Sequence, residues 1–241
     1  MALHQAKICM GCWEHMHLPV PLRGMASMPF RAFGIRPSRM NPNTCTICEM
    51  MFTKIMKARH VTIDATVMFA DLRGYTSLSQ SRSADEVSTL LDTFYDECAN
   101  AIWEHDGILN KTMGDGLLAL FNFPISHDDH ARRALRTAHL IQDRWRDIRT
   151  TLSEAAGQDI GVGIGIDCGR LSFGEFGHSH TDITAIGNVV NTAARAQAAA
   201  TSGQILLTEA VYARTQSELP DSQARDYQLK GFETVTRLYA A

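Results

Sequence analysis

VTIDATVMFADLRGYTSL (residues 61–78) and GILNKTMGDGLLALFNFP (residues 107–124) are the two segments that decide the fold. The apolar run VMFA predicts a buried strand that ends at Asp71. The apolar stretches on either side of Gly-Asp-Gly predict a hairpin, because glycines permit the positive φ that such a turn needs. Asp71 and Asp115 therefore each lie where a predicted strand ends.

The segment between these two is predicted to be a helix that brings the aspartates together. Ser83 and Glu86 have the spacing of a capping box, apolar residues recur with a helical period, and Gly107 ends the pattern. A crossover helix would place the first strand parallel to one hairpin strand, with the hairpin turn beside the end of the first strand. Two neighbouring carboxylates repel each other unless protons or cations intervene, so Asp71 and Asp115 predict a site for Mg²⁺ or Mn²⁺ and nucleotide phosphates. Taken singly, each is equally well explained as an ordinary turn or cap aspartate.

The remaining chain extends this pattern to a recognisable order of elements. Strand, helix, two strands, helix and strand is the ferredoxin-like order, so we expect an α+β fold with a βαββαβ core and an added C-terminal helix and strands. Further predicted elements are a helix capped by Ser126 and Asp129, strands at 161–167 and 171–173 with a turn at 168–170 between them, a helix at 188–199, a strand at 204–207, and a final hairpin of strands 227–230 and 235–239.

The composition is that of an ordinary globular protein. The 241 residues are 45% hydrophobic and 20% charged with a net charge of -3, so no basic excess indicates a nucleic-acid partner. No apolar run is long enough to form a transmembrane segment, and the first residues lack the apolar core of a signal peptide. We therefore expect a cytoplasmic location with mostly reduced thiols.

Residues 1–60 are predicted to be a Cys-rich N-terminal extension and linker. Cys9 and Cys12 form one C-x-x-C pair, and Cys45 and Cys48 form another. In the cytoplasm a metal is favoured over disulfides, and four thiolates can bind Zn²⁺ tetrahedrally or carry an iron–sulfur cluster. Redox-active thiols, a site shared between two subunits through the second pair alone, and a flexible tail with reduced cysteines remain alternatives.

The rest of this extension carries weaker patterns. The segment between the two pairs shows no clean period and is predicted to be irregular chain. Residues 48–57 predict a short apolar-faced helix, which is either a plain connector or a coupling element in front of the following domain. The two remaining cysteines, Cys98 and Cys168, are predicted to pack in the core of that domain.

Three motifs resemble a known family. FADLRGYTSLS (69–79), KTMGDGLLALF (111–121) and IGNVVNTAAR (186–195) are similar to motifs of the class III adenylate/guanylate cyclase catalytic domain, and the resemblance runs from about residue 61 to 239. It implies the class III nucleotidyl cyclase fold, with residues 61–241 as the catalytic domain. It also implies the reaction, in which the ribose 3′-hydroxyl of a nucleoside triphosphate attacks the α-phosphorus and pyrophosphate leaves.

The resemblance also implies site residues. Asp71, Asp115 and the backbone carbonyl of Leu72 would hold two Mg²⁺ or Mn²⁺ ions. The backbone at Gly74, Tyr75 and Thr76, where a helix is expected to start, would face the phosphates. In the other half of the site, Asn191 would orient the ribose, Arg195 would stabilise charge on the α-phosphate, and Lys230 would bind the terminal phosphates. Each of the last three, taken alone, is equally consistent with a solvated surface residue.

Lys111 and Thr184 match the two base-selecting positions of the family. A lysine donates to adenine N1 and a threonine hydroxyl accepts from adenine N6, whereas guanine presents the reverse pattern. We therefore expect an adenylate cyclase that makes 3′,5′-cyclic AMP. The alternatives are a cyclase for GTP or a pyrimidine nucleotide, and a non-catalytic nucleotide- or metal-sensing module. One departure is the loop HSHTDI (178–183), which lacks the family's basic residues and is one residue short.

The resemblance further implies a homodimer. Each site of the family lies between two catalytic domains, one of which supplies the aspartates and the other Asn191, Arg195 and the base-selecting residues. Because this chain carries both sets, two equivalent sites are expected. The Cys-rich N-terminus is then a candidate receiver for a regulatory protein or a redox signal.

Overall fold

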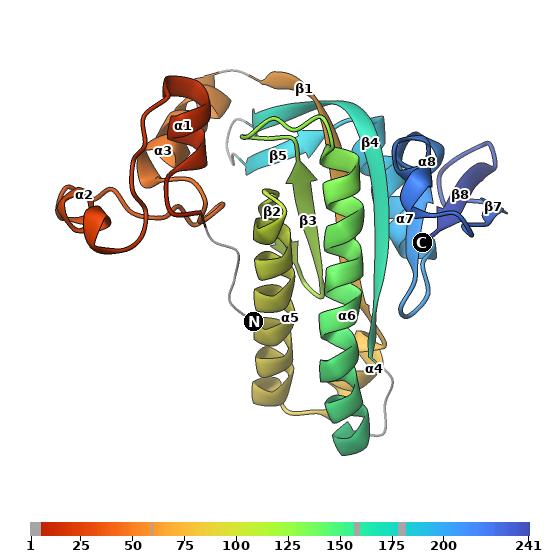
Figure 1. Cartoon of the computed structure of the whole chain (residues 1–241). Coiled ribbons are helices and arrows are strands. Elements are labelled where there is room, and N and C mark those ends of the chain that lie inside the picture. The colour runs from red at the N-terminus through yellow and green to blue at the C-terminus, as the bar shows by residue number, and fades with distance from the viewer. Residues whose placement is uncertain (1–5, 59, 157–159, 178–181) are drawn as a thin grey trace.

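The computed structural model describes residues 6–58, 60–156, 160–177 and 182–241, and its centre is an eight-stranded sheet (Figure 1). The strands lie in the order β2-β3-β1-β4-β6-β8-β7, and β5 pairs with β4 off this path. All neighbouring strands are antiparallel except β4 and β6. The strands are β1 (Val61–Arg73), β2 (Ile108–Met113), β3 (Gly116–Phe121), β4 (Gly161–Phe176), β5 (Asp182–Ile186), β6 (Ile205–Thr208), β7 (Ala224–Tyr227) and β8 (Thr236–Ala240).

The helices complete the predicted α+β core. The chain order β1, α5, β2, β3, α6, β4 combined with the sheet order β2-β3-β1-β4 is the ferredoxin-like arrangement, so the predicted fold class is confirmed. The helices are α1 (Met10–Met16), α2 (Met28–Ala32), α3 (Thr46–Ala58), α4 (Tyr75–Ser81), α5 (Ala84–Glu104), α6 (His130–Ala156), α7 (Asn188–Ala199) and α8 (Glu209–Thr215), with 3₁₀ turns η1 (Met25–Ser27) and η2 (Gln216–Glu218).

The crossover through α5 sets the position of the hairpin. Ser83 caps α5, and Glu86 returns the hydrogen bond to complete the predicted capping box. Because β3 is antiparallel to both β1 and β2, those two strands run in the same direction with β3 between them. The β2–β3 turn therefore lies beside the end of β1.

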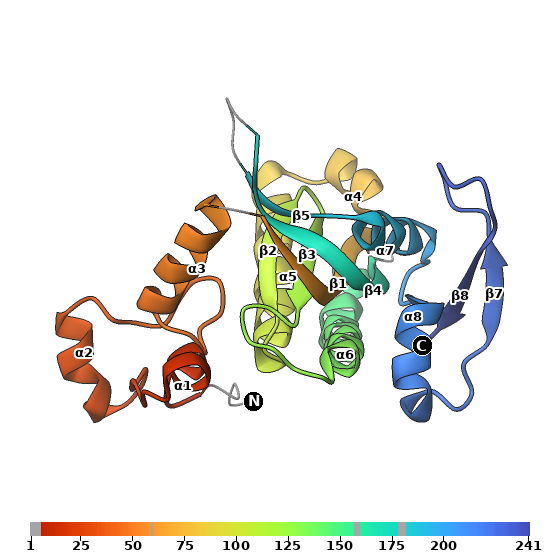
Figure 2. The same cartoon turned by 90° about the horizontal axis from the view of Figure 1, so that it is seen from above.

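The core occupies both faces of the sheet. Helices α5 and α6 lie side by side over one face, where Phe94 and Trp145 meet edge to face. Helix α7 covers part of the other face, seen from above in Figure 2. Beside it, Met56 of α3 is buried against the sheet in a cluster with Phe173. The N-terminal segment thus packs directly on the sheet through α3.

Three local predictions differ from the structure. Strand β4 runs without interruption through the turn predicted at 168–170, because every residue of β1 has a partner in β4 and this ladder outweighs the local turn signal. Helix α6 begins at His130, because the Asn122 side chain accepts hydrogen bonds from the Ser126 hydroxyl and the His127 backbone and shapes a loop there. Strand β7 ends at Tyr227, which leaves Lys230 in the following loop.

The N-terminal segment is more regular than predicted. Helix α2 and turn η1 interrupt the stretch between the two cysteine pairs, which was expected to be irregular. Helix α3 is somewhat longer than the helix predicted at 48–57. Within the described residues, no helix combines the length and the apolar character that crossing a bilayer requires.

Candidate functional site

The structure brings Asp71 and Asp115 to one place. Asp71 lies opposite Gly116 in the β1–β3 ladder, and the backbone N–H of Leu72 donates to the Asp115 carbonyl at 3.0 Å. A Cβ on Gly116 would stand 2.9 Å from Asp71 Oδ2, so glycine is needed beside the carboxylate. The Leu72 side chain is buried, which leaves only its backbone to serve the site. The two aspartates therefore lie beside each other at the end of β1, as predicted from the sequence.

The electrostatics of this pair favour a cation. Burial, followed by the charge of Asp115, raises the pKa of Asp71 to about 6. Arg73 opposes this shift, because its Nη1 lies 3.0 Å from Asp71 Oδ1. The same guanidinium donates to the carbonyls of Ala200, at 2.9 Å, and Gln197. Two adjacent carboxylates with hard oxygen donors and a raised pKa fit Mg²⁺ or Mn²⁺.

Neighbouring elements hold the turn and the end of β1. The hydroxyl of Tyr95 on α5 donates to the carbonyl of Gly114 in the turn. Gly74 adopts a φ of 83° and caps α4, which starts at Tyr75. Gly74 and Thr76 are exposed directly after the aspartate, in the position expected for phosphate contacts. Tyr95 and Arg73 are supporting residues that the sequence motifs did not single out.

The two residues predicted to select the base, Lys111 and Thr184, lie on β2 and β5. The ammonium of Lys111 forms an ion pair with Asp182, and the side-chain amide of Asn110 donates to the Ile183 carbonyl at 3.0 Å. Asp182 and Thr184 lie on the same face of β5, whereas Ile183 and Ala185 pack into the core. Lys111 therefore lies beside the strand that carries Thr184.

Asp182 is a candidate site residue that sequence reasoning missed, and it pairs with Lys111. Its only sequence signal is its position two residues before Thr184, which places both on one strand face. Residues 178–181 of the divergent loop lie outside the described residues. The consequence of its missing basic residues for phosphate binding therefore stays a prediction.

Asn191, Arg195 and Lys230 form a separate exposed set. Asn191 and Arg195 are exposed one helical turn apart on α7, whose opposite side is buried. Lys230 is exposed in the loop between β7 and β8. Gln197, on the buried side of the same helix, contacts Arg73 beside Asp71 through its backbone carbonyl. The exposed side of α7, with Asn191 and Arg195, is therefore not the side that contacts Arg73.

A second candidate site lies in the N-terminal segment. The sulfurs of Cys9, Cys12, Cys45 and Cys48 all lie within 4.8 Å of one another and are buried. Cys98 and Cys168 are also buried but lie apart from this cluster, in the core of the sheet and its helices.

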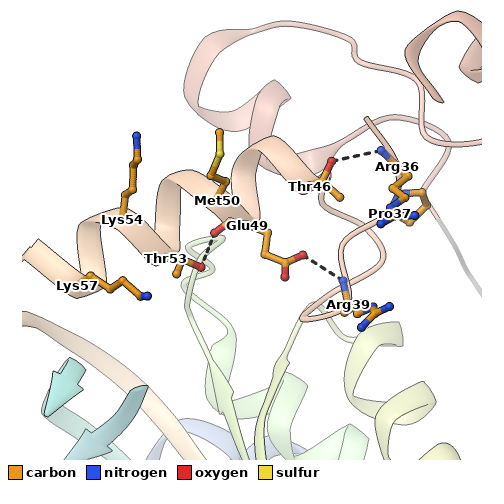
Figure 3. A pocket seen from close by; sticks show the side chains of 9 residues that line it. All are labelled: Arg36, Pro37, Arg39, Thr46, Glu49, Met50, Thr53, Lys54 and Lys57. Atoms are coloured by element: carbon orange, nitrogen blue, oxygen red, sulfur yellow. Dashed lines mark hydrogen bonds between the residues drawn. The ribbon is translucent and has the colours of Figure 1, made fainter. Parts of the chain in front are cut away.

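Beside the second cysteine pair, α3 borders an open hollow of about 660 Å³ (Figure 3). The Arg36 N–H donates to Thr46 Oγ1 at 3.4 Å, and the Arg39 N–H donates to Glu49 Oε2 at 3.2 Å. These contacts connect the loop before Cys45 to α3, the helix that contains Cys48. The hollow belongs to the N-terminal segment and not to the aspartate pair.

Comparison with known proteins identifies the larger part of the chain. The family model described as "Adenylate and Guanylate cyclase catalytic domain" matches residues 56–240. Among curated proteins, adenylate cyclase 1 of Rhizobium meliloti is 29% identical over 133 residues, which cover 55% of this chain and 20% of that protein. The adenylate cyclase of Anabaena cylindrica is 35% identical over 153 residues, covering 61% of this chain and 30% of that protein. The chain thus matches less than a third of the length of these relatives.

Solved structures of both substrate classes share the fold. The adenylyl cyclase CyaB from P. aeruginosa superposes with a TM-score of 0.69 at 25% identity, covering 76% of this chain and 95% of that chain. The guanylyl cyclase Cya2 superposes with a TM-score of 0.69 at 28% identity, covering 75% of this chain and 92% of that chain. Overall similarity therefore does not discriminate between ATP and GTP.

Proposed function

The chain belongs to the adenylate and guanylate cyclase catalytic domain family, and from this premise we propose that it converts ATP into 3′,5′-cyclic AMP and pyrophosphate. The observation that carries the proposal is the position of Lys111 beside β5, the strand of Thr184. In this proposal residues 61–241 are the catalytic domain and residues 1–60 are a regulatory extension.

The choice of ATP rests on hydrogen-bond complementarity. The Lys111 ammonium can only donate, which suits adenine N1 and leaves guanine N1–H facing another donor. The Thr184 hydroxyl can accept from adenine N6. Asp182 acts as a positioning residue, because its carboxylate holds the ammonium of Lys111 against β5. A donor left unpaired against the wrong base is a strong source of discrimination.

The remaining residues have roles in the phosphoryl transfer. Asp71 and Asp115 bind the divalent cations, and bound cations supply charge neutralisation and a lowered pKa for the attacking 3′-hydroxyl. Asn191 orients the ribose so that this hydroxyl lies in line with the α-phosphorus. Arg195 stabilises the charge that develops on the α-phosphate, and Lys230 binds the phosphates that leave.

We place the complete site between two copies of the chain. Every copy carries both the aspartate pair and the exposed Asn191 and Arg195 of α7. A symmetric dimer apposes the aspartates of one copy to Asn191 and Arg195 of the other, twice. The isolated monomer is then inactive.

The first test is product formation from ATP, GTP, CTP and UTP, each with Mg²⁺ and with Mn²⁺. Cyclic AMP from ATP, with the other nucleotides turned over at least tenfold less efficiently, supports the proposal. A preference for GTP or a pyrimidine nucleotide would reassign the substrate, and binding without any cyclic product would favour a sensing module. Asp115→Asn is the matched inactive control.

The second test separates the shared site from a site within one chain. Asp71→Ala and Arg195→Ala are each expected to be inactive, and a heterodimer of the two regains one intact site of two. After random exchange of equal amounts, half of the dimers are heterodimers, so about a quarter of the wild-type activity returns. Absence of recovery, with subunit exchange verified by differently tagged chains, would refute the shared site.

A further inference from the structure

The buried apolar cluster of the N-terminal segment consists mainly of cysteine side chains. Its members are Leu22 and the four cysteines, whose exposed fractions are 0–3%, with the partly buried Val20, Ile35, Ile47 and Phe52 packed against it. One leucine, four thiols and four half-buried side chains bury little apolar surface for a segment of this length. Small domains with so little core are usually held by a metal or disulfides.

The sulfur–sulfur distances discriminate between the candidate occupants. Cys9 and Cys48 are 3.6 Å apart, and Cys12 is 3.5 Å from both Cys45 and Cys48. Four thiolates about 2.3 Å from one tetrahedral Zn²⁺ lie about 3.8 Å apart. Because Cys12 Sγ is equally far from the sulfurs of Cys45 and Cys48, the distances within the cysteine cluster indicate no disulfide pairing. An iron–sulfur cluster distributes its cysteines over several iron ions and needs a wider cage.

We propose that Cys9, Cys12, Cys45 and Cys48 bind one Zn²⁺ as a mononuclear tetrathiolate site, and that this ion fixes the N-terminal segment on the end of α5. This proposal does not depend on the identity of the nucleotide.

The surroundings of the sulfurs suit thiolate ligands. The backbone N–H groups of Cys12 and Cys45 donate to Cys9 Sγ at 3.4 and 3.1 Å. Such N–H donors stabilise a sulfur that carries negative charge and orient it toward the ion. Gly11 makes room for the second pair, because a Cβ there would approach Cys48 Sγ to 3.0 Å.

Asn43 is the attachment point between the cysteine cluster and the catalytic part. Its carbonyl accepts from the N–H of Met10, next to Cys9, and it precedes Cys45 by two residues. Its side-chain amide donates to the Trp103 carbonyl at 3.1 Å and to Asp106 Oδ1 at 3.2 Å, at the end of α5. Asn43 is 4% exposed. An ion that fixes the two cysteine pairs therefore also fixes this contact.

Two further bonds strengthen the attachment. Asn41 Nδ2 donates to the Gly107 carbonyl at 3.0 Å, and Trp103 Nε1 donates to the Met40 carbonyl at 2.8 Å. Gly107 leads directly into β2, which carries Lys111 toward the turn of Asp115. The cysteine cluster is thus connected through Asn41 and Asn43 to the start of the β2–β3 hairpin, which carries Lys111 and Asp115.

The first experiment measures metal in the full chain, purified from cells supplied with both zinc and iron. We expect one zinc ion per chain, no acid-labile sulfide, and a tetrahedral thiolate spectrum after replacement by Co²⁺. Cys12→Ala should lose the metal, whereas the matched control Cys98→Ala should keep it. Iron with or without sulfide, a disulfide in the purified chain, or zinc retained by Cys12→Ala would each overturn the proposal.

A second experiment tests the site without relying on a variant that folds. Chelation of the wild-type chain should release zinc and make the cluster thiols reactive together, and hydrogen exchange should accelerate at least tenfold at the amides of His105, Asp106 and Gly107. Asn43→Ala should accelerate the same amides while retaining zinc. Unchanged exchange after zinc release would refute the attachment to α5, independently of nucleotide turnover.

Discussion

Replacement of Asp71 by asparagine is expected to stabilise the metal-free protein at neutral pH while abolishing cyclase activity. The pKa of Asp71 is raised from 3.8 to about 6, so ionising this carboxyl is harder in the folded chain than in the unfolded chain. Asparagine is isosteric with the protonated acid and remains neutral. The substitution therefore removes a penalty of up to about 3 kcal/mol, at about 1.36 kcal/mol per pKa unit.

The sign of the pH dependence follows from linkage. The folded state binds the Asp71 proton more tightly, so the penalty is complete above about pH 6 and disappears below about pH 3.8. Asp71→Asn should raise the melting temperature in EDTA by roughly 4 to 10 °C at pH 7.5 and change it little at pH 3.5. Mn²⁺ should largely cancel this difference, because at a hundredfold excess over Kd it stabilises the wild type by about 2.7 kcal/mol and the variant less.

The assay is thermal unfolding followed by circular dichroism at both pH values, with EDTA or Mn²⁺. Asp64→Asn is the matched control, since Asp64 lies on the same strand, is half exposed, and pairs with Arg214 at 3.4 Å. Its effect should stay within about 0.5 kcal/mol in either direction. If Asp71→Asn melted below the wild type in EDTA at pH 7.5, the ionised Asp71 carboxylate would not destabilise the metal-free fold, and the reasoning would be refuted.

Further predictions concern substrate choice, site positioning and stability. Lys111→Glu should lower kcat/KM for ATP by roughly tenfold or more and improve the relative use of GTP, measured by competition between the two nucleotides. Asp182→Asn should raise KM for ATP several-fold with a smaller change in kcat, and an unchanged KM would exclude a positioning role. Tyr95→Phe should reduce kcat through the loosened turn at Gly114, while the melting temperature changes by no more than a few degrees. Ser83→Ala should cost about 1 kcal/mol in urea unfolding without altering kcat, because it removes only the cap of α5.

Elements with a strong local signal were predicted closely from the sequence. The start of α5 follows from the Ser83 and Glu86 capping box, and α7 has the predicted bounds. The position of Asp71 at the end of β1 and of Asp115 in a glycine turn also follows from residues next to them in the chain. These features depend on backbone preferences within a few residues, which a single sequence records directly.

Several other local predictions differed from the structure. Residues 168–170 resemble a turn, yet they continue β4 because β1 pairs with them along its whole length. Strand β7 ends at Tyr227, where its pairing with β8 ends. The start of α6 was displaced by a local feature, the hydrogen bonds of Ser126 and His127 to Asn122.

The sequence by itself therefore determined the family, the order of the core elements and the chemical identity of the candidate site residues. The sequence also predicted that Asp71 and Asp115 lie together, whereas only the tertiary structure decided the other long-range contacts. Lys111 pairs with Asp182 across 71 positions, and Cys9 approaches Cys48 across 39. Arg73 joins Asp71 to the end of α7, 124 and 127 positions away. Such contacts depend on strand register and helix packing summed over the whole chain, and no local pattern of residues encodes that sum.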